Sequence, residues 1–108
     1  MTNHQQMYPE LQLFIDGEWL SKGSRNSEEV YNPATGEVLG VLPHATTADL
    51  DRALEAAQRG FRVWSAMLPE QRSAILRKAA EILRSKGEQV TSVASMESGK
   101  PIAQSRIE

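Results

Sequence analysis

Thr46-Thr47-Ala48-Asp49-Leu50 marks the point at which the sequence changes from a strand pattern to a helix pattern. Thr46 and Asp49 have the spacing of a capping box, in which the threonine hydroxyl accepts from the Asp49 amide and the aspartate reaches back to the Thr46 amide. Apolar residues then recur at helical intervals, namely Leu50, Ala53, Leu54, Ala57, Phe61 and Trp64. We therefore expect an amphipathic helix that Thr46 caps.

A second helix is expected to begin at Pro69, because the N–H that proline lacks would have no partner at the first helical position. It carries a wide apolar stripe formed by Ile75, Leu76, Ala79, Ala80, Ile82 and Leu83. Arg77 and Glu81 have the i,i+4 spacing of a surface ion pair worth about a few tenths of a kcal/mol. Gly87 offers a left-handed terminus, so we expect the helix to end there.

A third, shorter helix is expected from about Glu88, and its inner side would consist of Val90, Val93, Ala94 and Met96. Gly99 suits the end of this helix, and Pro101 pushes the residue before it out of the α region. Pro101 also suits the start of another helix, for which residues 101–108 supply only about two turns. We therefore expect a truncated N-terminal piece that stops inside this element.

The stretch before Thr46 has the pattern of four short strands in two pairs. In residues 11–20, Asp16-Gly17 fits the two-residue turn of a hairpin, since both residues tolerate a positive φ. The second pair flanks the breaker cluster Asn-Pro-Ala-Thr-Gly at 32–36, and Pro43 should end its last strand. The expected fold class is α+β, with two short β-hairpins followed by an α-helical segment. Residues 1–10 are expected to form an N-terminal tail.

Length and composition limit the class of protein. The chain has 108 residues, which suffices for one domain or for a piece of a larger one. Its 12 Lys and Arg residues stand against 14 Asp and Glu residues and form no basic footprint, so we expect no nucleic-acid partner. No apolar run approaches the roughly 20 residues of a membrane span, and the N-terminus lacks the features of a secretory signal. We therefore expect a cytoplasmic protein with no membrane partner.

Residue types that carry catalysis are scarce. The chain has no cysteine, which excludes a thiolate nucleophile and a thiolate zinc site within these residues. Its seven glycines include no pair separated by one residue, so the dinucleotide-binding fingerprint is absent. Pro101 follows Gly99-Lys100 where a phosphate loop requires Ser or Thr. His4 and His44 have no second base or ligand at a useful spacing.

Several other side chains have a structural and a functional interpretation. Phe61 and Trp64 could form a platform for ligand stacking, and Trp19 another. Because Phe61 and Trp64 continue the apolar phase of the first helix, core packing is favoured for both. For His44 we favour a loop role, and for Glu97 a solvated helix charge. We assign no catalytic, cofactor-binding or metal-binding residue.

The combined segments resemble the N-terminal end of the NAD(P)-dependent aldehyde dehydrogenase superfamily. The likeness rests on FIDGEW at 14–19, YNPATGEVLG at 31–40, residues 53–64, residues 72–83 and MESGKPI at 96–102. The segments NPATGE and ESGKP are distinctive in combination. The resemblance implies that residues 11–108 are the first portion of the family's NAD(P)-binding domain, which is an α/β Rossmann-like domain.

The resemblance also implies a chemistry. In the family, a cysteine thiolate attacks the aldehyde, a backbone amide and an asparagine hold the oxyanion, hydride passes to NAD or NADP, and a glutamate activates water. None of these residues maps before Glu108, so we expect this chain to be inactive and to bind neither cofactor. Some members hold a monovalent cation between main-chain carbonyls that match Tyr31 and Glu97, with a third ligand from later in the chain. Two carbonyls fall short of the about six oxygens that hard cations take, so no metal is assigned.

Within the superfamily, residues 13–107 are most similar to the succinate-semialdehyde dehydrogenase group. The implied reaction is oxidation of an aldehyde, with succinate semialdehyde as a candidate, to a carboxylic acid. The expected partner is the remainder of such an enzyme or a second copy of the chain. The alternative is a non-catalytic module, derived from a truncated gene, that associates with itself or with another protein. A reading frame that continues past Glu108 would separate the two.

Overall fold

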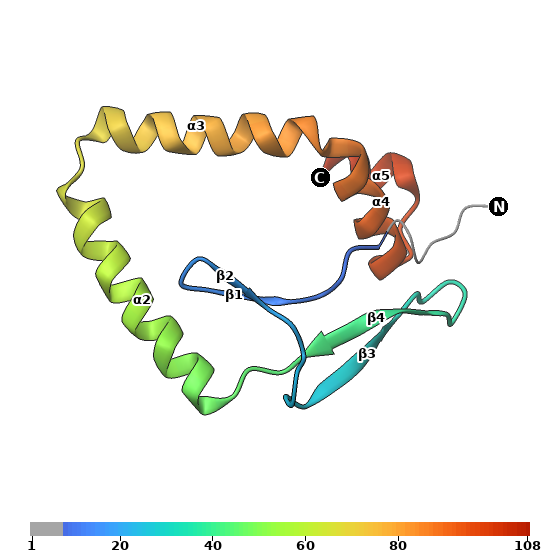
Figure 1. Ribbon diagram of the computed structural model, residues 1–108. Coiled ribbons are helices and arrows are strands. Elements are labelled where there is room, and N and C mark those ends of the chain that lie inside the picture. Colours follow the sequence, from blue (N-terminus) through green and yellow to red (C-terminus); the bar gives the residue numbers. More distant parts are fainter. Residues whose placement is uncertain (1–7) are drawn as a thin grey trace.

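The computed structural model describes residues 8–108, which form two β-hairpins followed by four helices (Figure 1). The strands are β1 (Leu13–Ile15), β2 (Glu18–Leu20), β3 (Ser27–Tyr31) and β4 (Val38–Pro43). The helices are α2 (Thr47–Ala66), α3 (Pro69–Ser85), α4 (Gly87–Ser98) and α5 (Ile102–Ile107). This order is the α+β arrangement expected from the sequence.

The first hairpin is closed by the predicted Asp16-Gly17 turn. Asp16 has φ 52° and Gly17 has φ 77°, so both turn residues are in the left-handed region, as a type I′ turn requires. β1 and β2 pair antiparallel, with Phe14 opposite Trp19. Ile15 points inward and is buried, whereas Phe14 and Trp19 are exposed.

The second hairpin joins β3 and β4 through the turn at residues 32–36. The Asn32 side chain accepts from the Ala34 amide at 2.9 Å, and Gly36 closes the turn with φ 76°. The register shifts between Val30 and Tyr31, where the ladder is irregular. β4 ends at Pro43, as predicted, because proline has no amide to continue the ladder.

The starts of α2 and α3 agree with the sequence, but the end of α3 does not. Pro69 is the first residue of α3, as predicted. Gly87, predicted to end α3 in a left-handed conformation, is instead the first residue of α4. Lys86 forms the junction with φ −106° and ψ 14°, and its carbonyl accepts from the Val90 amide of the next helix. Since one residue near the helical region bends the chain, no left-handed glycine is needed.

α4 ends at Gly99, which has φ 75° and donates its amide to the Ser95 carbonyl at 2.9 Å. This confirms Gly99 as a helix terminator. The predicted inner side of α4 is partly wrong, because Val90 is 47% exposed while Thr91 and Met96 are buried. The neighbours of α4 explain the difference, since α5 packs on its Ser95 side and the hydrophobic core on its Met96 side.

A small hydrophobic core joins the two ends of the described chain. Tyr8, Leu39 and Met96 form it, and Leu11, Val30 and Val93 pack against it. Tyr8 belongs to the segment predicted as a tail, yet it is only 6% exposed. A Cβ at Gly40 would lie 3.2 Å from a ring carbon of Tyr8, so glycine at this position lets the ring approach β4. The assignment of residue 8 to a tail is therefore corrected.

The helices leave the molecule open. In Figure 1, α2 and α3 form two sides of a frame, the first hairpin lies between α2 and α4, and the second hairpin lies below it. The radius of gyration is 17.2 Å, against about 13 Å for a compact domain of this length. Within residues 8–108, α3 packs closely against no other element. No helix among these residues combines the length and the apolar character needed to cross a membrane.

Candidate functional site

The predicted chemistry-bearing residues do not gather in one place. His44 lies between β4 and α2, where its Nε2 is 3.6 Å from Glu28 Oε1 and both side chains face solvent. Residues 8–108 hold no group of three or more His, Cys, Asp or Glu side chains that could bind a metal ion. His4 lies outside the described residues. His44 thus lies in an exposed loop, as predicted.

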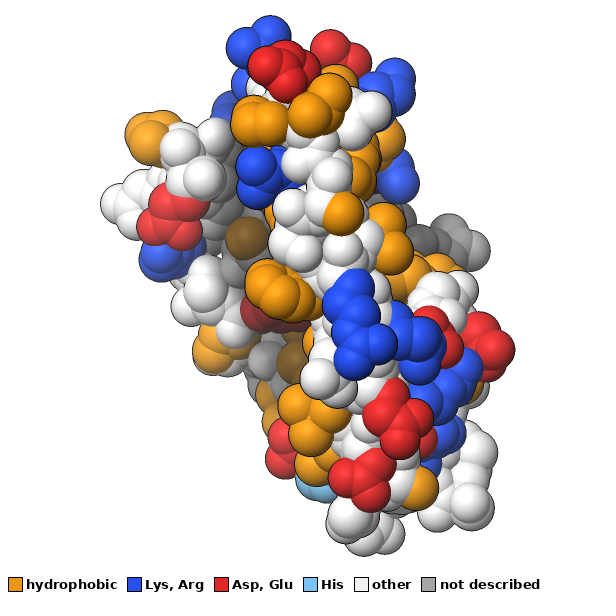
Figure 2. All heavy atoms as spheres, turned by 90° about the vertical axis from the view of Figure 1, so that its left-hand side faces the viewer, with side chains coloured by type: hydrophobic (Ala, Val, Ile, Leu, Met, Phe, Trp, Pro, Cys, Tyr) orange, Lys and Arg blue, Asp and Glu red, His pale blue; other side chains and the backbone are white. Residues whose placement is uncertain are grey.

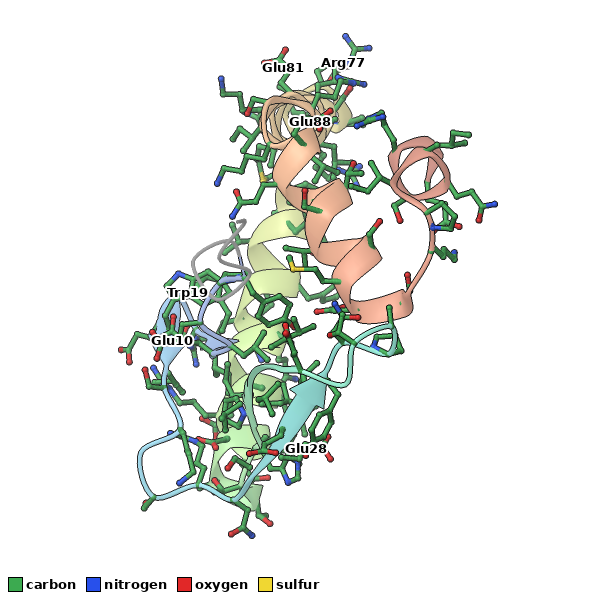
Figure 3. The ribbon with its side chains drawn as sticks, turned by 90° about the vertical axis from the view of Figure 1, so that its right-hand side faces the viewer. Glu10, Trp19, Glu28, Arg77, Glu81 and Glu88 are labelled. Atoms are coloured by element: carbon green, nitrogen blue, oxygen red, sulfur yellow. The ribbon has the colours of Figure 1, made fainter. Side chains whose placement is uncertain are left out.

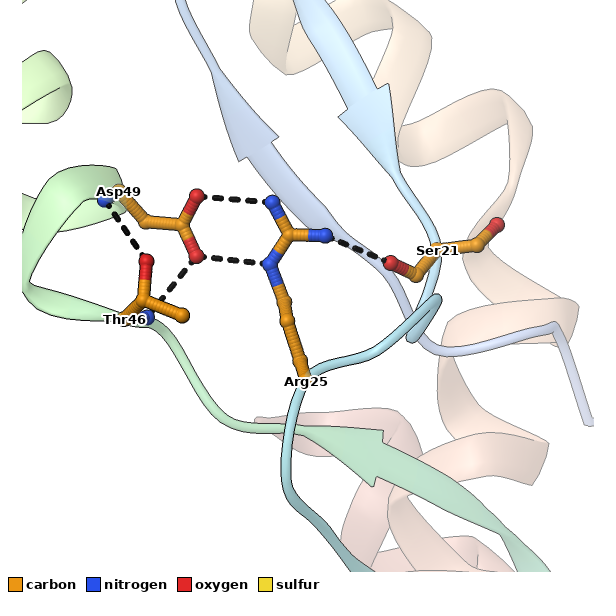
Figure 4. Close-up of polar contacts among 4 residues, drawn as sticks. All are labelled: Ser21, Arg25, Thr46 and Asp49. Atoms are coloured by element: carbon orange, nitrogen blue, oxygen red, sulfur yellow. Dashed lines mark hydrogen bonds and ion pairs between the residues drawn. The ribbon is translucent and has the colours of Figure 1, made fainter.

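A cluster of polar and charged residues lies at the start of α2 (Figure 4). The capping box is confirmed, with the Asp49 amide 3.1 Å from Thr46 Oγ1 and the Thr46 amide 2.9 Å from the Asp49 carboxylate. Arg25, from the loop between β2 and β3, donates from Nε and Nη2 to both oxygens of Asp49 at 2.7 and 2.8 Å. Its Nη1 donates to the Ser21 carbonyl at 3.0 Å. We call these four residues the Arg25–Asp49 clasp.

The electrostatics of the clasp indicate a structural role. The paired Arg25 guanidinium, and after it the Thr46 amide, hold the pKa of Asp49 well below its usual range. A carboxylate that stays ionised and has its acceptor positions occupied is poorly suited to exchange protons near neutral pH. The sequence pattern revealed the cap but not Arg25, because a single arginine in a polar loop has no periodic signal. The clasp fixes α2 against the loop that leaves the first hairpin.

The segments around Tyr31 and Glu97 also meet. The hydroxyl of Tyr8 donates to Glu97 Oε1 at 2.5 Å, so Glu97 has a partner beyond solvent. Burial and this hydrogen bond raise the pKa of Tyr8 to about 12. The turn that follows Tyr31 contacts the end of α4, since a Cβ at Gly99 would lie 3.3 Å from Pro33 Cγ. Two main-chain carbonyls remain too few oxygens for a hard cation, so no step is assigned to a metal.

Four glycines in the described part of the chain lie in turns or at a helix end. These are Gly17, Gly23, Gly36 and Gly99, all with positive φ, and none of them immediately precedes a helix whose amides could face a phosphate.

The largest unexplained feature is apolar surface on α2 and α3. Leu54 is 70% and Phe61 is 68% exposed, while Trp64 is half-buried. Figure 2 shows hydrophobic side chains at the surface beside charged ones on the side where α2 lies. The expectation that Phe61 packs in a core is thus wrong for this chain, because nothing within residues 8–108 covers its face of the helix. The predicted apolar stripe is present, but no element within residues 8–108 covers it.

Aromatic stacking occurs on the first hairpin. The ring centroids of Phe14 and Trp19 are 4.6 Å apart with the planes tilted by 43°. This cross-strand pair follows from the register, in which the two residues are direct partners. Figure 3 shows Trp19 on the hairpin side of the molecule, far from α3. Trp19 is therefore half of an exposed aromatic pair.

Charged residues on α3 divide into two groups. Arg77 and Glu81 lie on the side of α3 that points away from the rest of the chain (Figure 3). The ion pair of Glu81 is with Lys78, at 3.8 Å between Nζ and Oε2, in place of the predicted pair with Arg77. Both alternatives are exposed pairs of similarly small energy, so side-chain reach decides between them. Arg72 is different, because its Nε is shielded from solvent without a hydrogen-bond partner.

Arg72 lines a hollow at the elbow between α2 and α3. Trp64 contributes from α2, and Pro69, Ser73, Leu76, Arg77 and Ala80 contribute from α3. A shielded donor without an acceptor costs about 1–3 kcal/mol. A signal for this residue exists in the sequence, since Arg72 stands four residues before Leu76 and interrupts the apolar stripe.

Comparison with known proteins gives a consistent result. The profile of the aldehyde dehydrogenase family matches residues 19–108. An NAD-dependent aldehyde dehydrogenase from Sinorhizobium meliloti is 30% identical and superimposes with a TM-score of 0.86 over 96% of this chain and 21% of that chain. Succinate-semialdehyde dehydrogenase from Burkholderia pseudomallei is 34% identical, with a TM-score of 0.84 over 94% of this chain and 21% of that chain.

A third similar structure carries the cofactor. Betaine aldehyde dehydrogenase from Staphylococcus aureus, in complex with NAD+, is 27% identical, with a TM-score of 0.85 over 97% of this chain and 22% of that chain. The chain thus spans about a fifth of the length of these proteins.

Proposed function

Because the chain belongs to the aldehyde dehydrogenase family, we propose that it forms the N-terminal part of an NAD(P)-dependent enzyme that oxidises an aldehyde to a carboxylic acid. The observation that carries this proposal is the combination of a close backbone match with uncovered helices. The match extends over 96% of the chain, while the exposed apolar faces of α2 and α3 require a cover. The remaining four-fifths of such an enzyme would supply that cover.

In this proposal the chain is scaffold. It belongs to the Rossmann-like NAD(P)-binding domain, and the catalytic cysteine and glutamate come from the rest of the enzyme. NAD or NADP would accept the hydride from the aldehyde carbon. The sequence holds no cysteine and no pair of glycines separated by one residue, so the contribution proposed for it is to support the elements that carry the reacting groups.

The substrate proposed is a semialdehyde of a dicarboxylic acid, with succinate semialdehyde as the first choice. Its support is the 34% identity to the Burkholderia pseudomallei enzyme.

A chimera tests the assignment. Residues 11–108 replace the matching segment of the Burkholderia pseudomallei enzyme, and aldehyde-dependent formation of reduced nicotinamide is followed by absorbance. We expect an active chimera and no activity for the 108-residue chain alone. The control is the same junction built with the Sinorhizobium meliloti segment. The proposal would be contradicted if the control were active while the chimera with residues 11–108 was unfolded or inactive.

A second candidate function is a self-associating module without catalysis. The observation in its favour is the same exposed apolar surface on α2 and α3, which a second copy could also cover. Sedimentation of the 108-residue chain separates the two functions. A stable dimer of the 108-residue chain that binds no hydrophobic dye would favour the module. A 108-residue chain that binds the dye, and becomes compact only when it is joined to the rest of the enzyme, would favour the scaffold.

A further inference from the structure

Arg72 is a cation within an apolar helix face. Positions 72, 75, 76, 79 and 83 share one face of α3, because residues three and four apart lie above one another on a helix. Apart from Arg72, every member of this face is apolar, namely Ile75, Leu76, Ala79 and Leu83. Glu81 follows Arg72 by about two and a half turns, so it lies on the opposite side of α3. Since Glu81 points away from the rest of the chain in Figure 3, the face with Arg72 is turned toward it.

The Nε of the Arg72 guanidinium has no acceptor within residues 8–108, and it is shielded from solvent. The ion pairs in this part of the chain use other cations, including Arg25, Arg52, Arg59 and Arg106. The hollow beside Arg72 is lined by Trp64, Ser73, Leu76 and Ala80 and by a second cation, Arg77, so its lining offers no carboxylate. When the apolar face of α3 is covered, Arg72 is covered as well.

We infer that the element covering α3 carries an Asp or Glu carboxylate that pairs with Arg72 in the hollow at the α2–α3 elbow. This inference rests on the proposed function, because the covering element is taken from the part of the dehydrogenase beyond this chain. An arginine is almost never buried without a partner, and its planar fork matches a carboxylate with two parallel hydrogen bonds. The Arg25–Asp49 clasp shows the same two-bond geometry within the chain.

The occupant is assigned to the rest of the enzyme on the grounds of length and charge. The matched neighbours place about four-fifths of their chain outside this segment, which is ample to cover one helix face. Trp64, Leu76 and Ala80 supply apolar contacts around the carboxylate, which strengthen an ion pair by excluding water. Arg77 also lines the hollow and adds a second positive charge. The covering segment therefore combines an acidic residue with apolar neighbours.

The experiment uses the active chimera described above. Arg72→Met keeps the apolar stem and removes the charge, Arg72→Lys keeps a charge, and Arg84→Met is the matched control on the exposed side of α3. We expect Arg72→Met to lower Tm at a fixed scan rate by roughly 5–10 °C. Arg84→Met should change Tm little, and the Tm of Arg72→Lys should lie between those of Arg72→Met and Arg84→Met. A crystal structure of the chimera should show a carboxylate oxygen within about 4 Å of the Arg72 guanidinium.

Each other outcome overturns the inference in a recognisable way. Equal Tm values for Arg72→Met and Arg84→Met, or a guanidinium that contacts only water or carbonyl oxygens, would overturn the carboxylate while the proposed function stands. Dimerisation of the 108-residue chain that Arg72→Met abolishes would assign the carboxylate to a second copy. A chimera that fails to assemble beside an active control would remove the proposed function, and this inference with it.

Discussion

At the scale of single residues, Asp49 connects three parts of the chain. Its carboxylate accepts from the amide of Thr46 and from the guanidinium of Arg25, while its own amide donates to the Thr46 hydroxyl. The Asp49 side chain therefore joins three segments, namely the helix start at Thr46, the first turn of α2 and the loop after the first hairpin. Two predictions follow from this geometry.

Thr46→Ala removes the hydroxyl that caps α2. We expect the free energy of unfolding to fall by about 1 kcal/mol, because the Asp49 amide loses its acceptor. Urea denaturation followed by circular dichroism measures the change. Thr47→Ala is the control, since the capping hydroxyl belongs to Thr46. Coincident midpoints for the wild type and Thr46→Ala would show that the helix begins elsewhere.

Asp49→Asn tests the charge of the clasp. The pKa of Asp49 is lower in the folded state than in the unfolded state. The ionised carboxylate therefore stabilises the fold above the unfolded-state pKa of about 3.9, and this stabilisation is lost as the pH falls toward the folded-state pKa. We expect the variant to be less stable at neutral pH and to lose less stability on acidification below about pH 4. Denaturant midpoints measured across this range check the sign. Exposed Asp51→Asn is the control, and an equal acid dependence in both variants would contradict the prediction.

At the scale of elements, two glycines in helical segments have opposite requirements. Gly99 ends α4 with φ 75°, and a Cβ there would press on Pro33 at 3.3 Å. Gly60 lies inside α2, with nothing within 4 Å of an added Cβ. The same chemical change should therefore have opposite effects at the two positions.

Gly99→Ala is expected to destabilise the protein by about 1–2 kcal/mol, because an L-residue is strained in the left-handed region. Gly60→Ala should stabilise it by about 0.5–1 kcal/mol, since alanine loses less backbone freedom in a helix. Thermal unfolding of both variants beside the wild type gives the comparison. Two shifts of the same sign would show that one of these backbone conformations is misassigned.

At the scale of the whole molecule, the open frame exposes the faces that the sequence pattern marks as core. Tyr8, Ile15, Leu39 and Met96 are the hydrophobic residues buried in the described chain, against large exposed side chains along α2 and α3. If only about 400 Å² of this apolar surface were covered, burial would contribute roughly 10 kcal/mol before the costs of association. This driving force is of the size of a whole domain's stability.

We therefore expect the 108-residue chain alone to form dimers or larger species, or to bind a hydrophobic dye as a loosely packed monomer. Sedimentation equilibrium and dye fluorescence test this expectation. A single 12.0 kDa species with dispersed NMR signals and no dye binding would show that the helices complete a core by themselves.

Local patterns in the sequence predicted the elements well. The Asp16-Gly17 turn, the Thr46–Asp49 capping box, Pro69 at a helix start and Gly99 at a helix end are all confirmed. Each depends on interactions between residues no more than a few positions apart, so the sequence contains the whole cause. The periodic stripes of α2 and α3 were equally visible.

Only the tertiary structure decided which stripes are covered and which distant charges meet. Tyr8 reaches Glu97 across 89 positions and Arg25 reaches Asp49 across 24, and no local pattern encodes such pairs. Gly87 begins a helix because Lys86 bends the chain without a left-handed residue, which depends on where α4 packs. Periodicity predicts which face of a helix is apolar. Packing between elements determines which partner covers that face. Within residues 8–108 no element packs closely against α3, and the Nε of Arg72 has no acceptor there.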